Sequence, residues 1–230
     1  MIIQLEITRR CNRACPECIT HSNLFPWMPQ ADSDMTIEQI ERLIGEVKEN
    51  RTVQRIRIMG GEPLVHPQVV EISRLLHKEL LVPGHIQFLD FFSNGDGITQ
   101  KVLRALPPMT IKLSRWKHHN RMLVAPKDTG QSYRVPCKRP SHCGVCLNAY
   151  GYWPCAAGGS VAKLFQMHQY VQHKLPTETN AFGDLTALCE LCQMGAKKHI
   201  PWTPDCGPPS KSFVEAIERY KAENPEWKRY

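Results

Sequence analysis

Three cysteines stand close together near the start of the chain, in the order Cys11-x3-Cys15-x2-Cys18. Thiolates at this spacing can each bind one iron of a cubane iron–sulfur cluster, because such clusters use cysteine sulfur and a short loop can wrap a compact object. The fourth iron then stays open for a substrate or cofactor, as in a catalytic metal site with a free coordination position. A zinc knuckle is the alternative, and His21 is the nearest candidate for its fourth ligand.

A second group of cysteines lies in the C-terminal half of the chain. Its members are Cys137, Cys143, Cys146, Cys155, Cys189, Cys192 and Cys206. The pairs Cys143-x2-Cys146 and Cys189-x2-Cys192 have the spacing of a zinc ribbon, and residues 148–155 have the form of a hairpin that presents a further cysteine. Both interpretations predict a second metal site.

The composition is that of an ordinary globular protein. The chain has 230 residues, of which 42% are hydrophobic and 22% charged, and this excludes a disordered or fibrous chain. The net charge of +7 is spread along the sequence, so nucleic acid is not an expected partner. No apolar stretch approaches the roughly 20 residues of a membrane span. We expect no signal peptide, because the first apolar residues precede Arg9-Arg10 instead of following them. We therefore expect a cytoplasmic protein whose reduced thiols bind metal.

The sequence around the first cysteines predicts strands and helices in alternation. Alternation and β-branched residues predict strands over residues 2–8, 53–58, 85–92 and 110–114. Helical spacing and capping signals predict helices over residues 36–50, 67–76 and 98–106. This order predicts an α/β fold with parallel strands, as a barrel or an open sheet, whose chemistry lies on loops after the carboxyl ends of the strands.

The periodicity fades after about residue 115, where proline, glycine, cysteine and histidine become frequent. We therefore expect two domains, a partial (β/α) barrel over residues 1–130 and a small cysteine-rich domain over residues 131–230. Phe213, Ile217 and Tyr220 have helical spacing and predict a final helix in the second domain.

The motifs and their order resemble the radical S-adenosylmethionine (SAM) superfamily. The Cys11–Cys18 pattern after the first strand is the hallmark of that family, and Gly60-Gly61-Glu62-Pro63 after the second strand is identical to its methionine-binding motif. Ser93-Asn94-Gly95 resembles the family's segment near the ribose, and Ser114 resembles a serine that ends the fourth strand in many members. Ordinary turn chemistry is the alternative for these last two.

The resemblance implies a 4Fe–4S cluster on Cys11, Cys15 and Cys18, with SAM bound to the open iron. Small residues at the Gly60-Gly61 turn let backbone groups approach the amine of SAM, and Glu62 offers that amine a negative partner. Glu17 departs from the family, which usually has an aromatic residue before the third cysteine, packed near the adenine.

The cysteine-rich half resembles the auxiliary-cluster extensions of the same superfamily, called SPASM and twitch. The 17 residues between Cys137 and Cys155 resemble the arrangement in 2-deoxy-scyllo-inosamine dehydrogenase-like enzymes. The resemblance implies a shortened twitch with a second 4Fe–4S cluster on Cys137, Cys155, Cys189 and Cys192. Three alternatives stay open: Cys143 as first ligand, a separate site on Cys143, Cys146 and Cys206, or zinc in place of the cluster.

The implied function is that of a radical SAM oxidoreductase, which cleaves SAM to a 5′-deoxyadenosyl radical and abstracts hydrogen from a substrate carbon. We expect a small polar substrate, a two-electron oxidation, and an external electron donor such as flavodoxin or ferredoxin. A peptide-modifying enzyme and a non-catalytic iron–sulfur or zinc module are the alternatives. No catalytic acid or base is assigned, because Arg115 and His118-His119 are more typical of a solvated loop.

Overall fold

One sheet organises the part of the chain that the structure describes. The computed structural model describes residues 1–13, 15, 18–22, 33–114, 124–130, 139–178, 180–195 and 209–230. Within these residues the strands are β1 (Ile2–Thr8), β2 (Arg55–Gly60), β3 (Phe88–Ser93), β4 (Thr110–Leu113), β5 (Val145–Asn148) and β6 (Gly151–Trp153). They form a six-stranded sheet in the order β4-β3-β2-β1-β5-β6. All neighbours pair in parallel except β5 and β6, which form an antiparallel hairpin.

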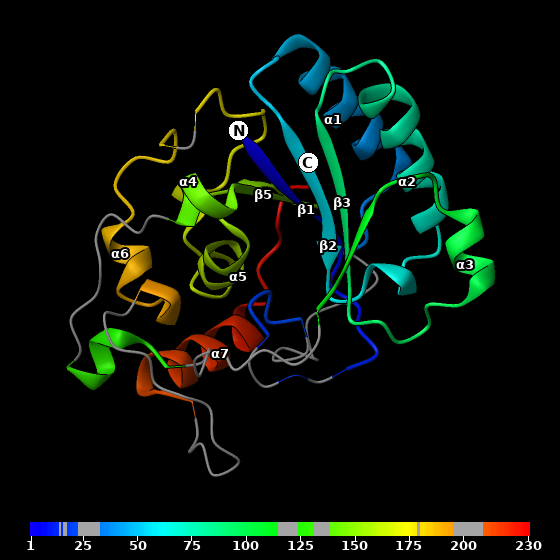
Figure 1. Ribbon diagram of the computed structural model, residues 1–230. Coiled ribbons are helices and arrows are strands. Elements are labelled where there is room, and N and C mark those ends of the chain that lie inside the picture. The colour runs from blue at the N-terminus through cyan, green and yellow to red at the C-terminus, as the bar shows by residue number, and fades with distance from the viewer. Residues whose placement is uncertain are drawn as a thin grey trace.

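Helices lie on both sides of this sheet. The helices that alternate with the first strands are α1 (Ile37–Glu49), α2 (Val69–Leu76) and α3 (Gln100–Ala105), and a π-helical turn, η3 (His77–Leu81), continues α2. The later helices are α4 (Arg139–Cys143), α5 (Ala156–Leu164), α6 (Thr186–Cys189) and α7 (Lys211–Glu223). Figure 1 shows the first group to the right of the strands and the later group to the left and below. Among the described residues, no helix has the length and apolarity needed to cross a membrane.

The alternation of β1 explains its place at the centre. Ile3, Leu5 and Ile7 are fully buried and belong to the same hydrophobic core as the apolar residues of α1. The helix begins at a capping box, in which the Thr36 hydroxyl accepts a hydrogen bond from Gln39 N (3.3 Å) and Gln39 Oε1 accepts one from Thr36 N (3.1 Å). The expected α/β class with a partial β/α arrangement is therefore confirmed.

The predicted elements agree with the structure apart from their ends. The first strand and the first helix fall where expected, whereas β2 and β3 begin two and three residues later than the patterns at 53 and 85 indicate. Gln54 O accepts hydrogen bonds from Gln87 N (2.8 Å) and Phe88 N (3.1 Å), and Ile86 N donates to Leu80 O (3.2 Å). The residues just before β3 therefore make hydrogen bonds to the end of the preceding helical turn and to Gln54, and this delays the start of the strand.

The hairpin β5–β6 adds the cysteine-rich half to the same sheet. Val145, Cys146 and Leu147 pair in register with residues 3–5 of β1. Gly144 makes this approach possible, since a Cβ there would lie 2.2 Å from Ile2 O and its φ is +95°. Tyr152 and Trp153 are fully buried in the shared core. The expected boundary at residue 130 and the twitch-like domain stay predictions.

Tyr230 is packed into the fold between α1 and the hairpin. Its N–H donates to Ala149 O (2.9 Å), and its carbonyl accepts from Gln39 Nε2 (2.8 Å). The ring makes an edge contact with Tyr152 at 5.4 Å between centroids, and its hydroxyl donates to Glu46 Oε2 (3.0 Å). Aromatic packing and main-chain hydrogen bonds therefore both hold this residue.

We expect Tyr230→Ala to lower the free energy of unfolding by about 3 kcal/mol, because it removes a large buried ring. Tyr230→Phe keeps the ring and loses only the hydroxyl hydrogen bond, so it should cost about 1 kcal/mol. Urea denaturation followed by circular dichroism measures both values. Equal losses in the two variants would show that the hydroxyl, and not the packing, provides the stabilisation.

Candidate functional site

The candidate site residues gather at one edge of the sheet. Because β1 to β4 are parallel, their carboxyl ends lie at the same edge. The loop with Cys11 to Cys18 follows β1, Gly60–Pro63 follows β2, Ser93–Gly95 follows β3, and Ser114 comes directly after β4. Ser114 N donates to Ser93 O (2.7 Å), which joins the last two. The structure thus brings the predicted SAM-site loops together.

The turn after β2 is joined by its backbone to the start of the cysteine loop. Gly61 N donates to Thr8 O and Glu62 N to Arg10 O, both at 2.9 Å. A Cβ at Gly60 would lie 2.2 Å from Thr8 O, and one at Gly61 would lie 2.3 Å from Arg10 O. Only glycine therefore permits this contact, which gives the two glycines a structural role that the sequence did not reveal.

Glu62 joins the same turn to the loop after β3. Its side chain is fully buried, and it accepts hydrogen bonds from Leu64 N at Oε1 (3.1 Å) and from Asn94 N at Oε2 (2.7 Å). Burial raises the pKa of this carboxyl, whereas the hydrogen bonds from Asn94, Leu64 and Ser93 act to lower it. Glu62 therefore fixes the Ser93–Asn94 turn. Its expected role as the partner of a ligand amine stays a prediction.

Two polar pairs connect the cysteine loop to the loop after β3. Asn94 Nδ2 donates to Asn12 Oδ1 (2.8 Å) and lies 3.9 Å from Cys11 Sγ. The guanidinium of Arg13 makes a two-point contact with Asp96, with Nε 2.6 Å from Oδ2, and this hydrogen bond lowers the pKa of Asp96. Arg13 and Asp96 were not predicted from the sequence, although Arg13 lies between Cys11 and Cys15 and Asp96 directly follows Gly95.

The three cysteines of the first loop fit an iron–sulfur cluster. All three are partly buried, and burial raises the pKa of Cys11, which the nearby charges of Cys18, Glu62 and Cys15 raise further. The thiols are therefore close enough to repel one another when ionised, and a cationic iron centre would relieve that repulsion. Among the described residues, no three His, Cys, Asp or Glu side chains lie close enough to bind one common metal ion. Cubane thiolates bind separate irons and need no common point.

A buried network holds the chain just beyond the third cysteine. Arg9 Nη1 donates to Ser160 Oγ (3.1 Å), and Arg9 Nη2 donates to His21 O (3.3 Å). Ser160 Oγ donates to Thr20 O (2.7 Å), and the Thr20 hydroxyl lies 3.2 Å from Cys18 Sγ. Ser160 belongs to α5, so the cysteine-rich half of the chain supports the first cysteine loop.

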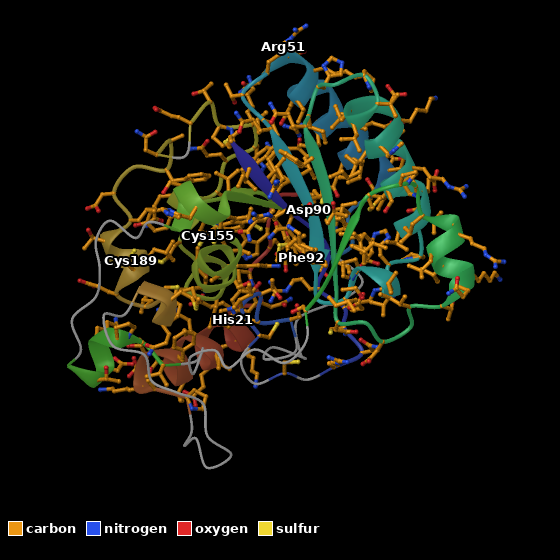
Figure 2. All side chains as sticks on the ribbon, in the orientation of Figure 1. His21, Arg51, Asp90, Phe92, Cys155 and Cys189 are labelled. Carbon is orange, nitrogen blue, oxygen red and sulfur yellow. The ribbon has the colours of Figure 1, made fainter. Side chains whose placement is uncertain are left out.

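Three of the expected auxiliary ligands lie on or beside two packed helices. Cys155 is the N-cap of α5, where its Sγ accepts a hydrogen bond from Gly158 N (3.3 Å). Cys189 ends α6, and Cys192 follows it; both side chains are buried. A Cβ at Gly158 would lie 3.3 Å from Cys155 Sγ and 3.2 Å from Leu188 of α6, so the two helices meet beside these cysteines. Figure 2 labels Cys155 and Cys189 on this side of the molecule.

The rest of the second cysteine set is divided. Cys137 and Cys206 lie outside the described residues, so the ligand set for a second cluster stays a prediction. Cys143 ends α4. Cys146 is fully buried in β5, with Sγ 3.8 Å from Glu6 Oε2, and burial followed by the charge of Glu6 raises its pKa well above the ordinary value. Such a thiol is unreactive.

Several other residues weighed for function also lie outside the described part of the chain. These are Glu17, Arg115, His118 and His119. Trp153 of β6 lies in the core, where its Nε1 donates to Asn148 Oδ1 (2.9 Å).

Three proteins of known name are similar to this chain in sequence. The GTP 3′,8-cyclase 1 of Mycobacterium tuberculosis is 27% identical over 100 residues, which cover 44% of this chain and 27% of that protein. The GTP 3′,8-cyclase of Rhodopirellula baltica is 38% identical over 76 residues, covering 33% and 21%. Molybdenum cofactor biosynthesis protein 1 of Mus musculus is 40% identical over 76 residues, covering 33% and 11%. The matches thus cover 27% or less of the length of these relatives.

Two solved structures are also similar. BtrN in an open conformation is 14% identical, with a TM-score of 0.47 over 93% of this chain and 96% of that one. BtrN in complex with AdoMet and 2-DOIA is 20% identical, with a TM-score of 0.36 over 45% of this chain and 39% of that one.

A family model described as the Radical SAM superfamily matches residues 5–117. This segment begins inside β1 and extends past β4, so it includes each of the four loops that meet at the carboxyl edge of the sheet. Residues 5–117 therefore form a domain of the radical SAM superfamily.

Proposed function

We propose that this chain is a radical SAM oxidoreductase, which cleaves SAM reductively to a 5′-deoxyadenosyl radical that removes a hydrogen atom from a substrate carbon. One observation supports this most directly. The cysteine loop, the Gly60–Glu62 turn and the Ser93–Asn94 turn form a single hydrogen-bonded unit at the carboxyl edge of the sheet. That unit places thiolate donors beside backbone groups and buried polar side chains.

The residues of this unit have distinct roles in the proposal. Cys11, Cys15 and Cys18 would hold the 4Fe–4S cluster, which when bound supplies the electron for SAM cleavage. Gly60–Pro63 would bind the methionine part of SAM, and Ser93, Asn94 and Ser114 would lie on the ribose side. Because Glu62 already fixes the position of Asn94, the two halves of the SAM site are held at a constant separation.

The second cysteine set completes the proposal. A second 4Fe–4S cluster on Cys137, Cys155, Cys189 and Cys192 would accept an electron from the substrate radical, which makes the net reaction a two-electron oxidation. The substrate would be a small polar molecule, and a flavodoxin or ferredoxin would supply electrons. We do not propose the cyclase activity named for these relatives, because the matches cover 27% or less of their length.

Anaerobic reconstitution tests the first step. With SAM and dithionite, the protein should produce 5′-deoxyadenosine and should contain about eight irons per chain if both sites are cubanes. Replacing Cys11, Cys15 and Cys18 together by alanine should remove about half of the iron and abolish cleavage. Cys155→Ala is the matched control, because it should spare cleavage. A wild-type protein that retains its first cluster but forms no 5′-deoxyadenosine would contradict the proposal.

Glu62→Gln tests the link between the two turns. The Glu62 carboxylate accepts one hydrogen bond at each oxygen, from Leu64 N and from Asn94 N. In glutamine one of these oxygens becomes an NH₂ group, which cannot accept, so one of the two buried N–H groups loses its partner. We expect SAM to bind about tenfold more weakly while the iron content stays unchanged. Equilibrium dialysis with labelled SAM measures this, and Glu71→Gln, on the exposed side of α2, is the control. Unchanged SAM affinity would exclude the linking role.

Ser160→Ala tests the support that α5 gives to the cysteine loop. The variant leaves Arg9 Nη1 and Thr20 O without their buried partner, which should cost about 1–3 kcal/mol of stability. We also expect faster loss of iron from the first site to a chelator. Ser212→Ala, which breaks a solvent-exposed hydrogen bond to Asp128, should change neither value. Iron release as slow as in wild type would show that the network does not hold the loop.

A further inference from the structure

The sheet has one apolar and one charged face along β2, β3 and β4. Ile56, Ile58, Leu89 and Phe91 belong to the hydrophobic core. Because successive side chains of a strand point to opposite faces, the residues between them lie on the other face. There the strands carry Arg55, Arg57, Asp90 and Lys112.

Three cations converge on one carboxylate of this face. Asp90 Oδ2 lies 3.0 Å from Lys112 Nζ, 3.7 Å from Arg55 Nη1 and 3.8 Å from Arg57 Nε. The Asp90 side chain is 3% exposed. Asp90 balances one of these three positive charges, so the cluster carries an excess of positive charge as far as the described residues go.

The cations keep donors for a further acceptor. Arg57 donates from Nη1 to Cys143 O (3.3 Å), while its Nε is buried and makes no hydrogen bond with the described residues. The Lys112 side chain is 40% exposed, and an ammonium has three donors. Among the described residues, an acceptor that reaches the exposed Lys112 would therefore find both positive charge and hydrogen-bond donors.

Two aromatic rings hold the cations in place. The Arg55 guanidinium lies 4.3 Å from the centroid of Phe88, and Lys112 Nζ lies 5.4 Å from that of Phe92. Phe88 is 47% exposed, so apolar surface also borders the cluster. Figure 2 labels Asp90 and Phe92 on β3, the strand between Arg57 and Lys112.

An ion-pair network that only stabilises a fold is expected to be balanced. Elsewhere among the described residues, Arg10 pairs with Asp34 at 2.6 Å and Arg13 with Asp96 at 2.5 Å, one cation to one carboxylate. Burial of charge is costly unless it is compensated, and an unbalanced excess of cations adds repulsion to that cost. The excess on β2 to β4 is therefore better explained by an anion that binds there.

We infer that this face binds an anionic group of the substrate, a phosphate or a carboxylate, with Lys112, Arg57 and Arg55 as its positive partners. The inference rests on the proposed function, because Lys112 lies two residues before Ser114 at the edge where SAM would bind. A molecule held by its anionic end at this cluster would extend along the sheet toward that edge. The substrate class is then a small polar anion.

Direct binding tests the inference without any turnover. The probes are inorganic pyrophosphate, citrate and uncharged myo-inositol, titrated into the reconstituted protein by calorimetry at low salt. We expect saturable binding of pyrophosphate, citrate or both, weakened by added salt, and none of myo-inositol. The anion with the higher affinity distinguishes a phosphate from a carboxylate site.

Variants locate the binding. Lys112→Gln should weaken anion binding about tenfold, whereas Lys112→Arg keeps the charge and should retain most of it. Lys78→Gln removes a lysine that is 81% exposed on η3 and should have no effect. Urea denaturation of each variant shows whether it is folded. Absence of saturable anion binding in wild type, or an equal loss in Lys78→Gln, overturns the inference.

The same samples separate this inference from the proposed function. Production of 5′-deoxyadenosine from SAM is measured alongside the titrations. Anion binding that depends on Lys112 without any SAM cleavage would overturn the proposed function and leave the anion site. Cleavage in a protein that binds neither anion would overturn the anion site and leave the proposed function.

Discussion

The candidate site depends on two backbone hydrogen bonds, from Gly61 N to Thr8 O and from Glu62 N to Arg10 O. They fix the end of β2 against the first residues of the cysteine loop, at a separation that no side chain at residues 60 and 61 would permit. The Glu62 carboxylate then carries the constraint to Asn94. Three loops are thereby positioned before any ligand arrives, so a bound cofactor need not pay for ordering them.

A buried cation extends this constraint to the second half of the chain. Arg9 is 6% exposed, and its charge is accommodated by Glu6 at 3.9 Å and by hydrogen bonds to Ser160 and His21 O. Removal of one member would leave the others buried and unpaired, which makes such networks cooperative. The pairing of β5 with β1 brings α5 to this place. The sheet and the network together couple the two cysteine sets mechanically.

Local patterns predicted the elements, whereas the contacts between them had no local signal. The strand at 2–8 and the helix at 36–50 follow from alternation and from the Thr36–Gln39 capping box. The gathering of the motif loops follows from parallel topology alone. The pairing of β5 with β1, by contrast, joins residues about 140 positions apart, and the four residues Val145–Asn148 are too short to show periodicity. Ser160, inside an apolar helix, gave no hint of its contact with Arg9.

The charged face of the sheet differs in burial and in charge balance between β1 and β4. This difference would orient a molecule that binds along the face. At β1, Glu6 is 1% exposed, has Arg9 as its positive partner at 3.9 Å, and accepts a hydrogen bond from Asn148 Nδ2 (3.4 Å). At β2 to β4, cations outnumber carboxylates, and their side chains reach 40% exposure at Lys112. Because unbalanced cations repel one another and are only partly hydrated here, an anion bound among them would stabilise this part of the face. An anionic group bound as proposed would therefore reach the face at the exposed Lys112, and not at β1, where Glu6 is buried.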